Sequence, residues 1–451
     1  MIDNHQNKLE LFKSNPSKAL WTLSIPMMLG MSVQAIYMLI DTAFIGNWVG
    51  GSALAGLGLV FPPLFIIMGI TFGLGSGATT VIAKSIGEEN KENADSAADH
   101  IIFLGILLSL FFIVIGYFFG ENIIKYQSTD PLIVKHASDY FFTMLSGTFF
   151  MIMSIFFRSI LSGEGDNLFP MKVLGLGTLI NLILDPILIY YYQIKGAALA
   201  TVISQVIVFI IFTFIMIFKK HTYITINLSK FKFNYNILMQ ILRLGIPASL
   251  SMLIMSIGLF FYNKILAMTE FPLEAIAAYS TAHRIEHLFF IPIISIATSM
   301  VTLVGMFYGS KRLDLINKVV SYGLSNALAI SCIFGLLFFT SSQFIFPIFT
   351  DNIKIIKIGV EYFKIFSFAI PLVTLTMICS RVMQGLGKAY PMLIITCLRV
   401  IIISCSLAYL FIEVMNKPLY FAWISILLSC LASSLLAVIW MINIKKKIRF
   451  N

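Results

Sequence analysis

Apolar residues along the chain fall into twelve long runs separated by short polar segments. The predicted spans are 19–46, 54–83, 100–120, 133–161, 170–192, 196–218, 240–268, 275–304, 320–347, 356–383, 390–412 and 419–443. Each is long enough for a helix rising about 1.5 Å per residue to cross a hydrocarbon core of about 30 Å. The runs are apolar on every face, which excludes a transmembrane β-barrel with its alternating strands. The pattern predicts an all-α membrane protein with twelve transmembrane helices.

The composition supports this interpretation. Hydrophobic residues make up 59% of the 451 positions and charged residues only 12%, whereas a soluble domain has about 25% charged residues. The mean hydropathy is +0.92. The first 18 residues are polar and lack an apolar core and a cleavage site, so we expect no removable signal peptide. The five cysteines include no CxxC pair and are expected to be small buried hydrophobes: Cys332, Cys379, Cys397, Cys405 and Cys430.

Lysine and arginine are unevenly distributed between the two sets of loops. With the N-terminus inside, the inner segments hold 21 of the 31 basic residues and the outer loops hold seven. This excess follows the positive-inside rule and predicts that both termini are cytoplasmic, in a cell membrane. It also accounts for the net charge of +10. Because the basic residues are spread over every inner loop, the charge does not indicate a nucleic-acid partner.

The two halves of the chain repeat one another at an offset of 221 or 222 residues. Leu23-Ser24-Ile25-Pro26 returns as Leu244-Gly245-Ile246-Pro247, and the turn Ser162–Gly165 returns as Gln384–Gly387. Six spans separate the copies, so both enter the membrane from the same side, a transporter architecture. We therefore predict two pseudo-symmetric six-helix lobes, 1–218 and 240–451, joined by a cytoplasmic linker at 219–239.

Two carboxylates lie deep inside predicted spans, where an ionised group is costly. They are Asp41 in the first span and Asp185 in the fifth, and neither has a basic residue one turn away. Each is therefore either buried in its protonated form or helps to hold a cation. Asn181 lies one turn before Asp185 on the same helix face, so its amide carbonyl and the carboxylate can converge on one point. Thr201 adds a hydroxyl on the next span. Such hard oxygen ligands suit Na⁺ or a protonatable cluster; the alternatives are acids satisfied by neighbouring hydroxyls and, for Thr201, ordinary helix packing.

The first span also has a stripe of residues at helical spacing that ends at Asp41. The stripe and the tyrosine one turn before the acid are Met27, Met31, Gln34, Tyr37 and Met38. A deformable thioether wall with an amide and a phenol suits varied amphipathic, often cationic ligands, and predicts a substrate-binding surface. Plain packing is the alternative for each of these side chains.

The second half lacks the two acids. At the offset of 221, Asp41 corresponds to Tyr262 and Asp185 to Ser406. The second half instead has charged residues in or beside its spans: Lys264, His283, Arg284, Glu286, His287 and Arg399. The group at the start of the eighth span is either a structural ion-pair cluster or gate, or a substrate contact. Arg399 either extends to a span end or pairs with a helix terminus, or it locks the lobe or contacts substrate.

No signature of a soluble enzyme is present, and we expect no enzymatic activity and no cofactor. The run Gly73–Gly77 lacks the Lys-Ser/Thr of a phosphate loop and lies inside an apolar span, so it indicates close helix packing or a flexible point. Without a site for ATP hydrolysis, the energy source is expected to be an ion gradient.

The chain resembles the MATE (multidrug and toxic compound extrusion) transporters, in particular their DinF-like prokaryotic branch. The resemblance covers nearly the whole chain and is carried by Ile25–Met28, Asp41–Gly46, Asn181–Pro186, Gly196–Thr201 and Arg381–Gly387. In that branch, the counterparts of Asp41, Asn181, Asp185 and Thr201 form a cation site beside a substrate cleft. The acidic second-lobe site of the NorM-like branch has no match in the seventh span.

The resemblance implies antiport of Na⁺ or H⁺ against organic cations and other drugs, by a protein that we expect to be a monomer in the bilayer. The alternative is a lipid-linked oligosaccharide flippase of the wider superfamily, which would require a different, typically basic cavity. A channel or receptor is a third interpretation, and it predicts no ion-coupled uphill transport.

Overall fold

Helices account for nearly all of the regular structure in the computed structural model, which describes residues 3–219, 222–227, 229 and 231–448. Twelve helices within this described part are long and apolar enough to cross a membrane, which confirms the predicted all-α architecture. Lys220, Lys230 and Arg449, counted above among the basic residues of inner segments, lie outside the described residues.

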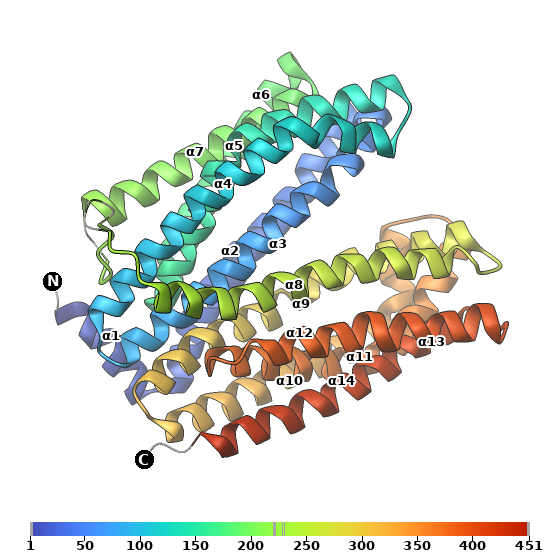
Figure 1. Ribbon diagram of the computed structural model, residues 1–451. Coiled ribbons are helices and arrows are strands. Elements are labelled where there is room, and N and C mark those ends of the chain that lie inside the picture. Colours follow the sequence, from blue (N-terminus) through green and yellow to red (C-terminus); the bar gives the residue numbers. More distant parts are fainter. Residues whose placement is uncertain (1–2, 220–221, 228, 230, 449–451) are drawn as a thin grey trace. The chain divides into compact units, whose positions relative to one another are not determined.

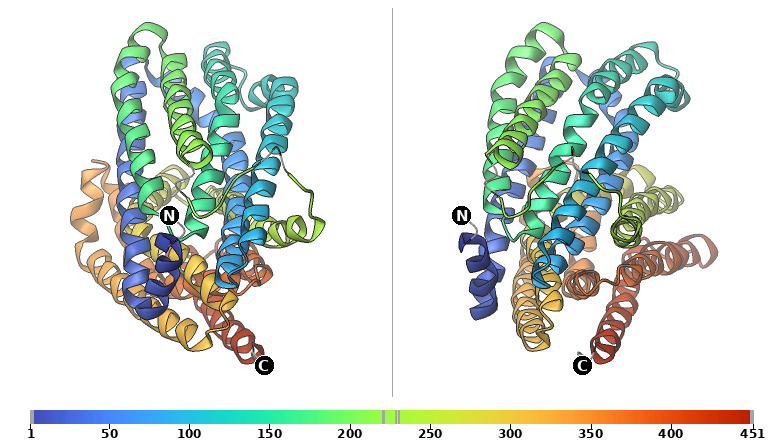
Figure 2. Two further views of the ribbon diagram at one scale, coloured as in Figure 1. Left: turned by 90° about the vertical axis from the view of Figure 1, so that its left-hand side faces the viewer. Right: turned by 60° about the vertical axis from the view of Figure 1, so that its left-hand side comes forward.

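The first half begins with a short helix, α1 (Asp3–Ser14), followed by six long ones. These are α2 (Pro16–Trp48), α3 (Gly51–Gly87), α4 (Lys91–Gln127), α5 (Pro131–Gly163), α6 (Leu168–Tyr192) and α7 (Ile194–Thr213), the last continued by a π-helical turn at Phe214–Phe218. Figures 1 and 2 show α2 to α7 running side by side. Helix α5 packs against α3, α4 and α7 and so forms the centre of this bundle.

The second half has the same order of spans, with one interrupted helix. Its helices are α8 (Tyr235–Leu266), α9 (Pro272–Gly309), α10 (Leu313–Ile345), α11 (Ile353–Gly385), α12 (Tyr390–Cys397), α13 (Ser406–Tyr409) and α14 (Tyr420–Lys447). Helices α12 and α13 belong to one span, Tyr390–Val414, in which π-helical segments occupy Leu398–Cys405 and Leu410–Val414. A 3₁₀ turn, Phe346–Ile348, follows α10.

The repeat is visible in the backbone as well as in the sequence. Asp130 caps α5 by accepting hydrogen bonds from Leu132 and Ile133, and Asn352, 222 positions later, caps α11 in the same way. Gly165 and Gly387, again 222 apart, both have φ +78° just after these helices end. Such a left-handed conformation is accessible to glycine without steric cost. The two halves therefore start and stop their equivalent helices with equivalent residues.

The chain divides into two compact units. The first contains Met1–Leu9 and Ile25–Ile246, and the second contains Glu10–Ser24 and Pro247–Asn451. Helices α2 and α8 each pass from one unit to the other, and both do so at the repeated Leu-x-Ile-Pro motif. Glu10–Ser24 is tied to the second unit by the indole of Trp21, which donates a hydrogen bond of 3.0 Å to the hydroxyl of Tyr322.

The described part of the connection between α7 and α8 is held on the first unit. The Ile224 N–H donates to Glu164 Oε1 at 2.6 Å, the Thr225 N–H donates to Asp95 at 2.9 Å, and the Asn227 N–H donates to Asp99 at 3.0 Å. Backbone groups outside a helix need such partners. The segment 224–227 is therefore ordered on the first unit, at its basic end, and is called the strap below.

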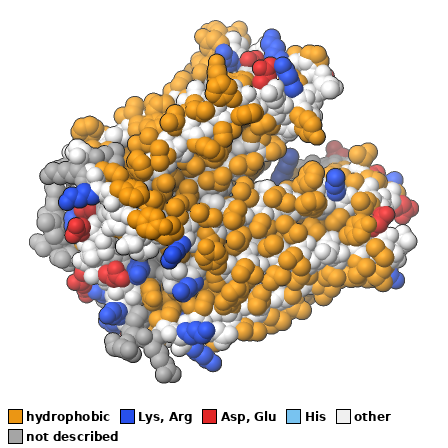
Figure 3. Space-filling model, viewed as in Figure 1, with side chains coloured by type: hydrophobic (Ala, Val, Ile, Leu, Met, Phe, Trp, Pro, Cys, Tyr) orange, Lys and Arg blue, Asp and Glu red, His pale blue; other side chains and the backbone are white. Residues whose placement is uncertain are grey.

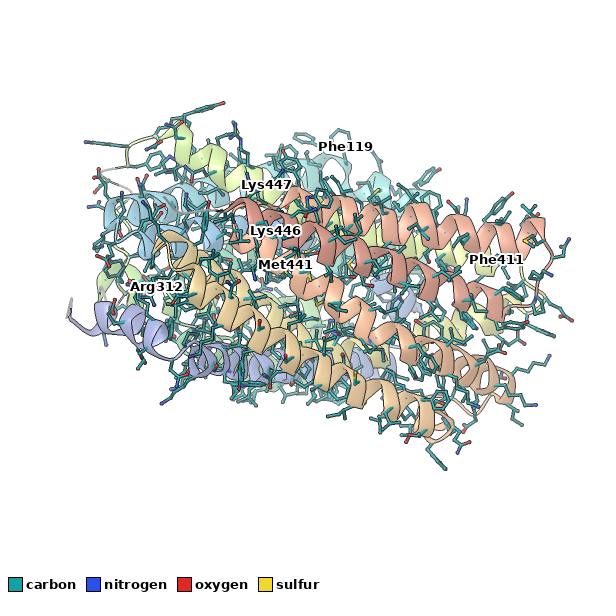
Figure 4. All side chains as sticks on the ribbon, turned by 90° about the horizontal axis from the view of Figure 1, so that it is seen from below. Phe119, Arg312, Phe411, Met441, Lys446 and Lys447 are labelled. Atoms are coloured by element: carbon teal, nitrogen blue, oxygen red, sulfur yellow. The ribbon has the colours of Figure 1, made fainter. Side chains whose placement is uncertain are left out.

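Side chains are sorted along the helices as a membrane requires. Most charged groups visible in Figure 3 gather toward helix ends, whereas the helix sides are mostly hydrophobic. In the second unit, Arg312, Lys446 and Lys447 lie toward one end of the bundle and Phe411 toward the other (Figure 4). Three of the five free cysteines are buried, as expected. Cys332 is exposed on α10, so the expectation was wrong for this residue. The reason is that lipid can cover an apolar helix face that the protein leaves open.

Candidate functional site

The structure brings Asp41 and Asp185 together in the first unit. Asp41 lies near the end of α2, and Asp185 lies in α6 immediately before Pro186. Asp185 is fully buried, and Asp41 Oδ1 is buried without a hydrogen-bond partner among the described residues. The two carboxyl groups interact directly. Two carboxylates this close repel each other in a low-dielectric interior, so the pair requires a shared proton or a bound cation.

Two neighbours orient the carboxylate of Asp185. The Tyr37 hydroxyl donates a hydrogen bond of 2.7 Å to Oδ2, and the Asn181 amide donates one of 3.0 Å to Oδ1. Asn181 is buried and one helical turn from Asp185, as its spacing predicted. Its amide nitrogen, rather than its carbonyl, faces the acid in this arrangement. Both donors stabilise an ionised Asp185 and leave Asp41 as the carboxyl group without a fixed donor.

Tyr37 was predicted to bind substrate, but its hydroxyl belongs to the acid pair. A second phenol, Tyr140 of α5, lies close enough to Asp41 and Asp185 to interact with both electrostatically. No sequence pattern singles out Tyr140, because a tyrosine in an apolar span is common and its partners lie on other helices. The acid pair is therefore surrounded by side chains from α2, α5 and α6.

The side-chain hydrogen bond of Thr201 in the described structure is within its own helix and not with the acid pair. Its hydroxyl donates to the Ala197 carbonyl at 3.1 Å, one turn back in α7. A hydroxyl that donates to its own helix keeps its lone pairs available to a cation. Its role in cation binding remains a prediction.

The stripe on α2 is only partly exposed. Met27 is buried, Met31 is half-buried, and Gln34 and Met38 are exposed on the first unit. A substrate-binding surface formed by the exposed members stays a prediction.

The second unit has its own buried polar cluster. Glu286 is only 4% exposed, and its Oε2 lies 3.1 Å from His283 Nδ1 one turn earlier in α9. Its Oε1 is buried with no hydrogen-bond partner in the described part of the chain. Beside it, Tyr279 stacks on Trp423 and Tyr362 packs edge-to-face against both, with ring centroids 5.0–5.9 Å apart. This cluster lies in the core of the second unit, whereas Arg284 is exposed.

In the repeat, the counterpart of Asp41 has a structural role. Tyr262, the counterpart of Asp41, is buried and donates to the Ala422 carbonyl at 2.5 Å. Arg399 lies in the π-helical segment Leu398–Cys405, beside Cys430 and Tyr279. π-Helical turns of this kind are frequent at functional positions.

A family model named MatE matches residues 26–187 and 247–410, which together include the acid pair and the equivalent part of the second repeat. The chain belongs to the MatE family. This confirms the resemblance to MATE transporters. The probable multidrug resistance protein NorM of Thermotoga maritima is 26% identical over 433 residues, covering 94% of this chain and 92% of its own length. The multidrug export protein MepA of Staphylococcus aureus (strain MRSA252) is 26% identical over 388 residues, 84% of each chain.

Solved structures of MatE-type transporters have the same fold. An outward-facing multidrug resistance MATE family transporter of the MOP superfamily aligns with a TM-score of 0.90 at 30% identity, over 98% of this chain and 99% of that one. A MOP superfamily transporter from Pyrococcus furiosus, whose binding pocket has reversed polarity, aligns with a TM-score of 0.93 at 29% identity, over 97% and 98%. The predicted twelve-helix, two-lobe architecture is therefore confirmed.

Proposed function

We propose that this MatE-family protein is a secondary active antiporter that exports organic cations and other drugs in exchange for Na⁺ or H⁺. The observation that carries the proposal is the buried Asp41–Asp185 pair, which requires a cation or proton to be stable in a membrane interior. The relatives described above are named for multidrug resistance or export, which favours this function over oligosaccharide flipping.

The acid pair supplies the coupling step. An inward ion gradient drives Na⁺ or H⁺ onto the carboxylates and neutralises them. Because Tyr37 of α2 is hydrogen-bonded to Asp185 of α6, a change of charge at the pair alters how these two helices pack. The ion then favours the substrate-releasing state by its difference in affinity for the two states, which is the most that any ligand can contribute.

We infer the orientation from the charged loops. The basic ends of the helices face the cytoplasm of a cell membrane, with both termini on that side, following the positive-inside rule. Basic groups at one end of the second unit, including Arg312, Lys446 and Lys447, support this orientation. We also propose that the transporter works as a monomer, since each chain contains a complete acid pair.

Transport in proteoliposomes tests the proposal. Asp41→Asn and Asp185→Asn are each expected to abolish ethidium transport driven by an imposed Na⁺ or H⁺ gradient while the protein remains monodisperse. Glu121→Gln is the matched control, because Glu121 is an exposed acid on α4 whose partner Lys125 lies one turn away. Wild-type rates in either Asn variant would exclude the acid pair as the coupling site. Wild-type protein that moves ethidium under neither gradient would exclude antiport of this substrate. Imposing the two gradients separately identifies the coupling ion.

A further inference from the structure

A crevice with charged and apolar walls opens in the first unit between α5 and α7, at the end opposite the strap. Its volume is about 360 Å³. The lining side chains include Ser138, Asp139, Phe142, Thr143, Lys195 and Leu199. With Ser146, which also lines it, five of the seven lining residues carry polar or charged groups.

The crevice lies beyond a closely packed part of the contact between α5 and α7. Deeper in the bundle, Gly147 of α5 lies against Val202 of α7 with no room for a larger residue. Phe149 and Phe150 pack edge-to-face on Phe209, with ring centroids 5.5 and 5.4 Å away. Toward the other end, α7 begins abruptly after Gln193, whose φ is +54°. Lys195 lies in the first turn of α7, on the wall of the crevice.

Opposite charges line this crevice without neutralising each other. Within the described residues, no ion pair within 4 Å joins Asp139 or Lys195 to any group. The Thr143 hydroxyl donates to the Asp139 backbone carbonyl at 2.7 Å and leaves the carboxylate free of it. A carboxylate and an ammonium group on facing walls match a ligand that carries both charges in the reverse order.

The depth of the crevice matches that of lipid headgroups. Helix α5 has 33 residues, so it is about 50 Å long and, when centred on a hydrocarbon core of about 30 Å, extends about 10 Å beyond each side. At the helical rise, Asp139 lies about 12 Å from its start, close to the membrane surface, and Ser146 lies about 10 Å deeper. Tyr190, Tyr191 and Tyr192, exposed at the end of α6, mark the same level, as aromatic residues do at membrane interfaces.

We propose that this crevice binds the headgroup of a zwitterionic phospholipid with a primary ammonium group, phosphatidylethanolamine, from the outer leaflet. The ammonium group donates to Asp139, and the phosphate accepts from Lys195. An acyl chain then follows Phe142 and Leu199 toward Ser146 and the exposed apolar surface at Ile203. The primary ammonium has three N–H donors for the carboxylate, whereas the quaternary ammonium of phosphatidylcholine has none. The site is separate from the acid pair, and it rests only on the membrane location and orientation of the protein.

Native mass spectrometry of detergent-solubilised protein with palmitoyl-oleoyl phospholipids tests this site. We expect wild type to retain phosphatidylethanolamine in preference to phosphatidylcholine and phosphatidylglycerol. Asp139→Asn and Lys195→Gln should each weaken retention about five- to tenfold, the effect of losing one charge-assisted contact. Lys135→Gln, an exposed lysine one turn before Asp139 on the same helix, should leave it unchanged.

Three results would overturn the proposal. The first is equal retention of phosphatidylethanolamine by wild type and both crevice variants. The second is equal retention of the three lipids by wild type. The third is displacement of the lipid by free phosphoethanolamine at equal concentration, because this result would identify a site for a soluble zwitterion. The substituted side chains lie on the walls of an open crevice, so both variants should fold. A variant that is not monodisperse is replaced by the reversed pair, Asp139→Lys with Lys195→Asp, which restores both charges and should recover at least part of the preference.

Discussion

The hydroxyl of Tyr37 donates a hydrogen bond of 2.7 Å to Asp185, 148 positions further along the chain. The contact joins α2 to α6 at the point where both carry an acid. Since Asp185 also accepts from Asn181 on its own helix, each of its oxygens has one donor. Protonation or cation binding at Asp185 lowers its negative charge and so weakens the charge-assisted hydrogen bond from Tyr37. The phenol is a direct link between charge at the site and the packing of α2.

Tyr37→Phe should preserve the fold and weaken coupling. The substitution removes one donor to a buried carboxylate, a loss of about 1.5–3 kcal/mol for a bond to a charged group. We expect the ion concentration needed for half-maximal ethidium transport to shift by roughly tenfold. Tyr190→Phe, an exposed tyrosine on α6, is the control and should behave as wild type. An unchanged ion dependence in Tyr37→Phe would show that the hydrogen bond does not contribute to coupling.

Glu164 predicts a pH dependence of stability at the strap. Burial raises the pKa of its carboxyl from 4.5 to about 8, although the Ile224 N–H opposes this change. The folded protein thus binds this proton more tightly than the unfolded chain does. The resulting stabilisation of the folded protein is full below about pH 4.5 and is lost as the pH rises through about 8. Between these two values the free energy of unfolding falls by about 1.4 kcal/mol for each pH unit.

We accordingly expect a lower thermal unfolding midpoint at pH 9 than at pH 6, and a much smaller difference in Glu164→Gln, which cannot ionise. Thermal unfolding in detergent at the two pH values measures this. Glu121→Gln, on the exposed surface of α4, should keep the wild-type difference. If Glu164→Gln keeps the full wild-type pH dependence of thermal stability, that dependence arises from other groups.

The packing of Trp423 predicts that the second unit is most sensitive to loss of this side chain. It is 1% exposed and packs against Tyr279 and Tyr362. Trp423→Ala leaves a large cavity in this cluster and should cost about 3–5 kcal/mol. Leu435→Ala, on an exposed face of the same helix, is the control and should cost much less. The stability of the two variants is compared by measuring the fraction of monodisperse protein that remains after heating. An equal loss of monodisperse protein in both would contradict the prediction.

The fold was largely predictable because membrane helices are specified locally. Each apolar run satisfies its own backbone, and no other element is needed to identify it. The ends were less predictable: the apolar pattern predicts the third span at 100–120, whereas α4 extends from Lys91 to Gln127. Its first turns are polar and continue beyond the apolar segment, and Asn90 caps them by accepting from the Asn93 N–H. Helix ends depend on such caps rather than on hydrophobicity.

The site was predictable only where one helix carries the information. The spacing of Asn181 and Asp185 predicts that their side chains meet, but it does not predict that the amide nitrogen rather than the carbonyl faces the acid. The cost of burying acids selects Asp41. The roles of Tyr37 and Tyr140 depend on which helices become neighbours, and this is not encoded in the spacing along one span. The strap was not predicted for the same reason, because its partners Asp95 and Asp99 look like ordinary exposed acids in the sequence.

Asn181 separates proton coupling from Na⁺ coupling. Asn181→Asp adds a third carboxyl group within one turn of Asp185, and more negative charge strengthens binding of a hard cation or a proton. If Na⁺ is the coupling ion, this variant should show a larger Na⁺-induced rise in thermal stability at pH 8 than wild type, and Asn181→Ala should show a smaller one. If H⁺ is the coupling ion, Na⁺ has no effect on any of the three, and the pH for half-maximal transport rises in Asn181→Asp instead. Thermal unfolding with and without NaCl, with choline chloride at equal ionic strength as the control, distinguishes the two. Identical responses of wild type, Asn181→Asp and Asn181→Ala in both measurements would remove Asn181 from the coupling site.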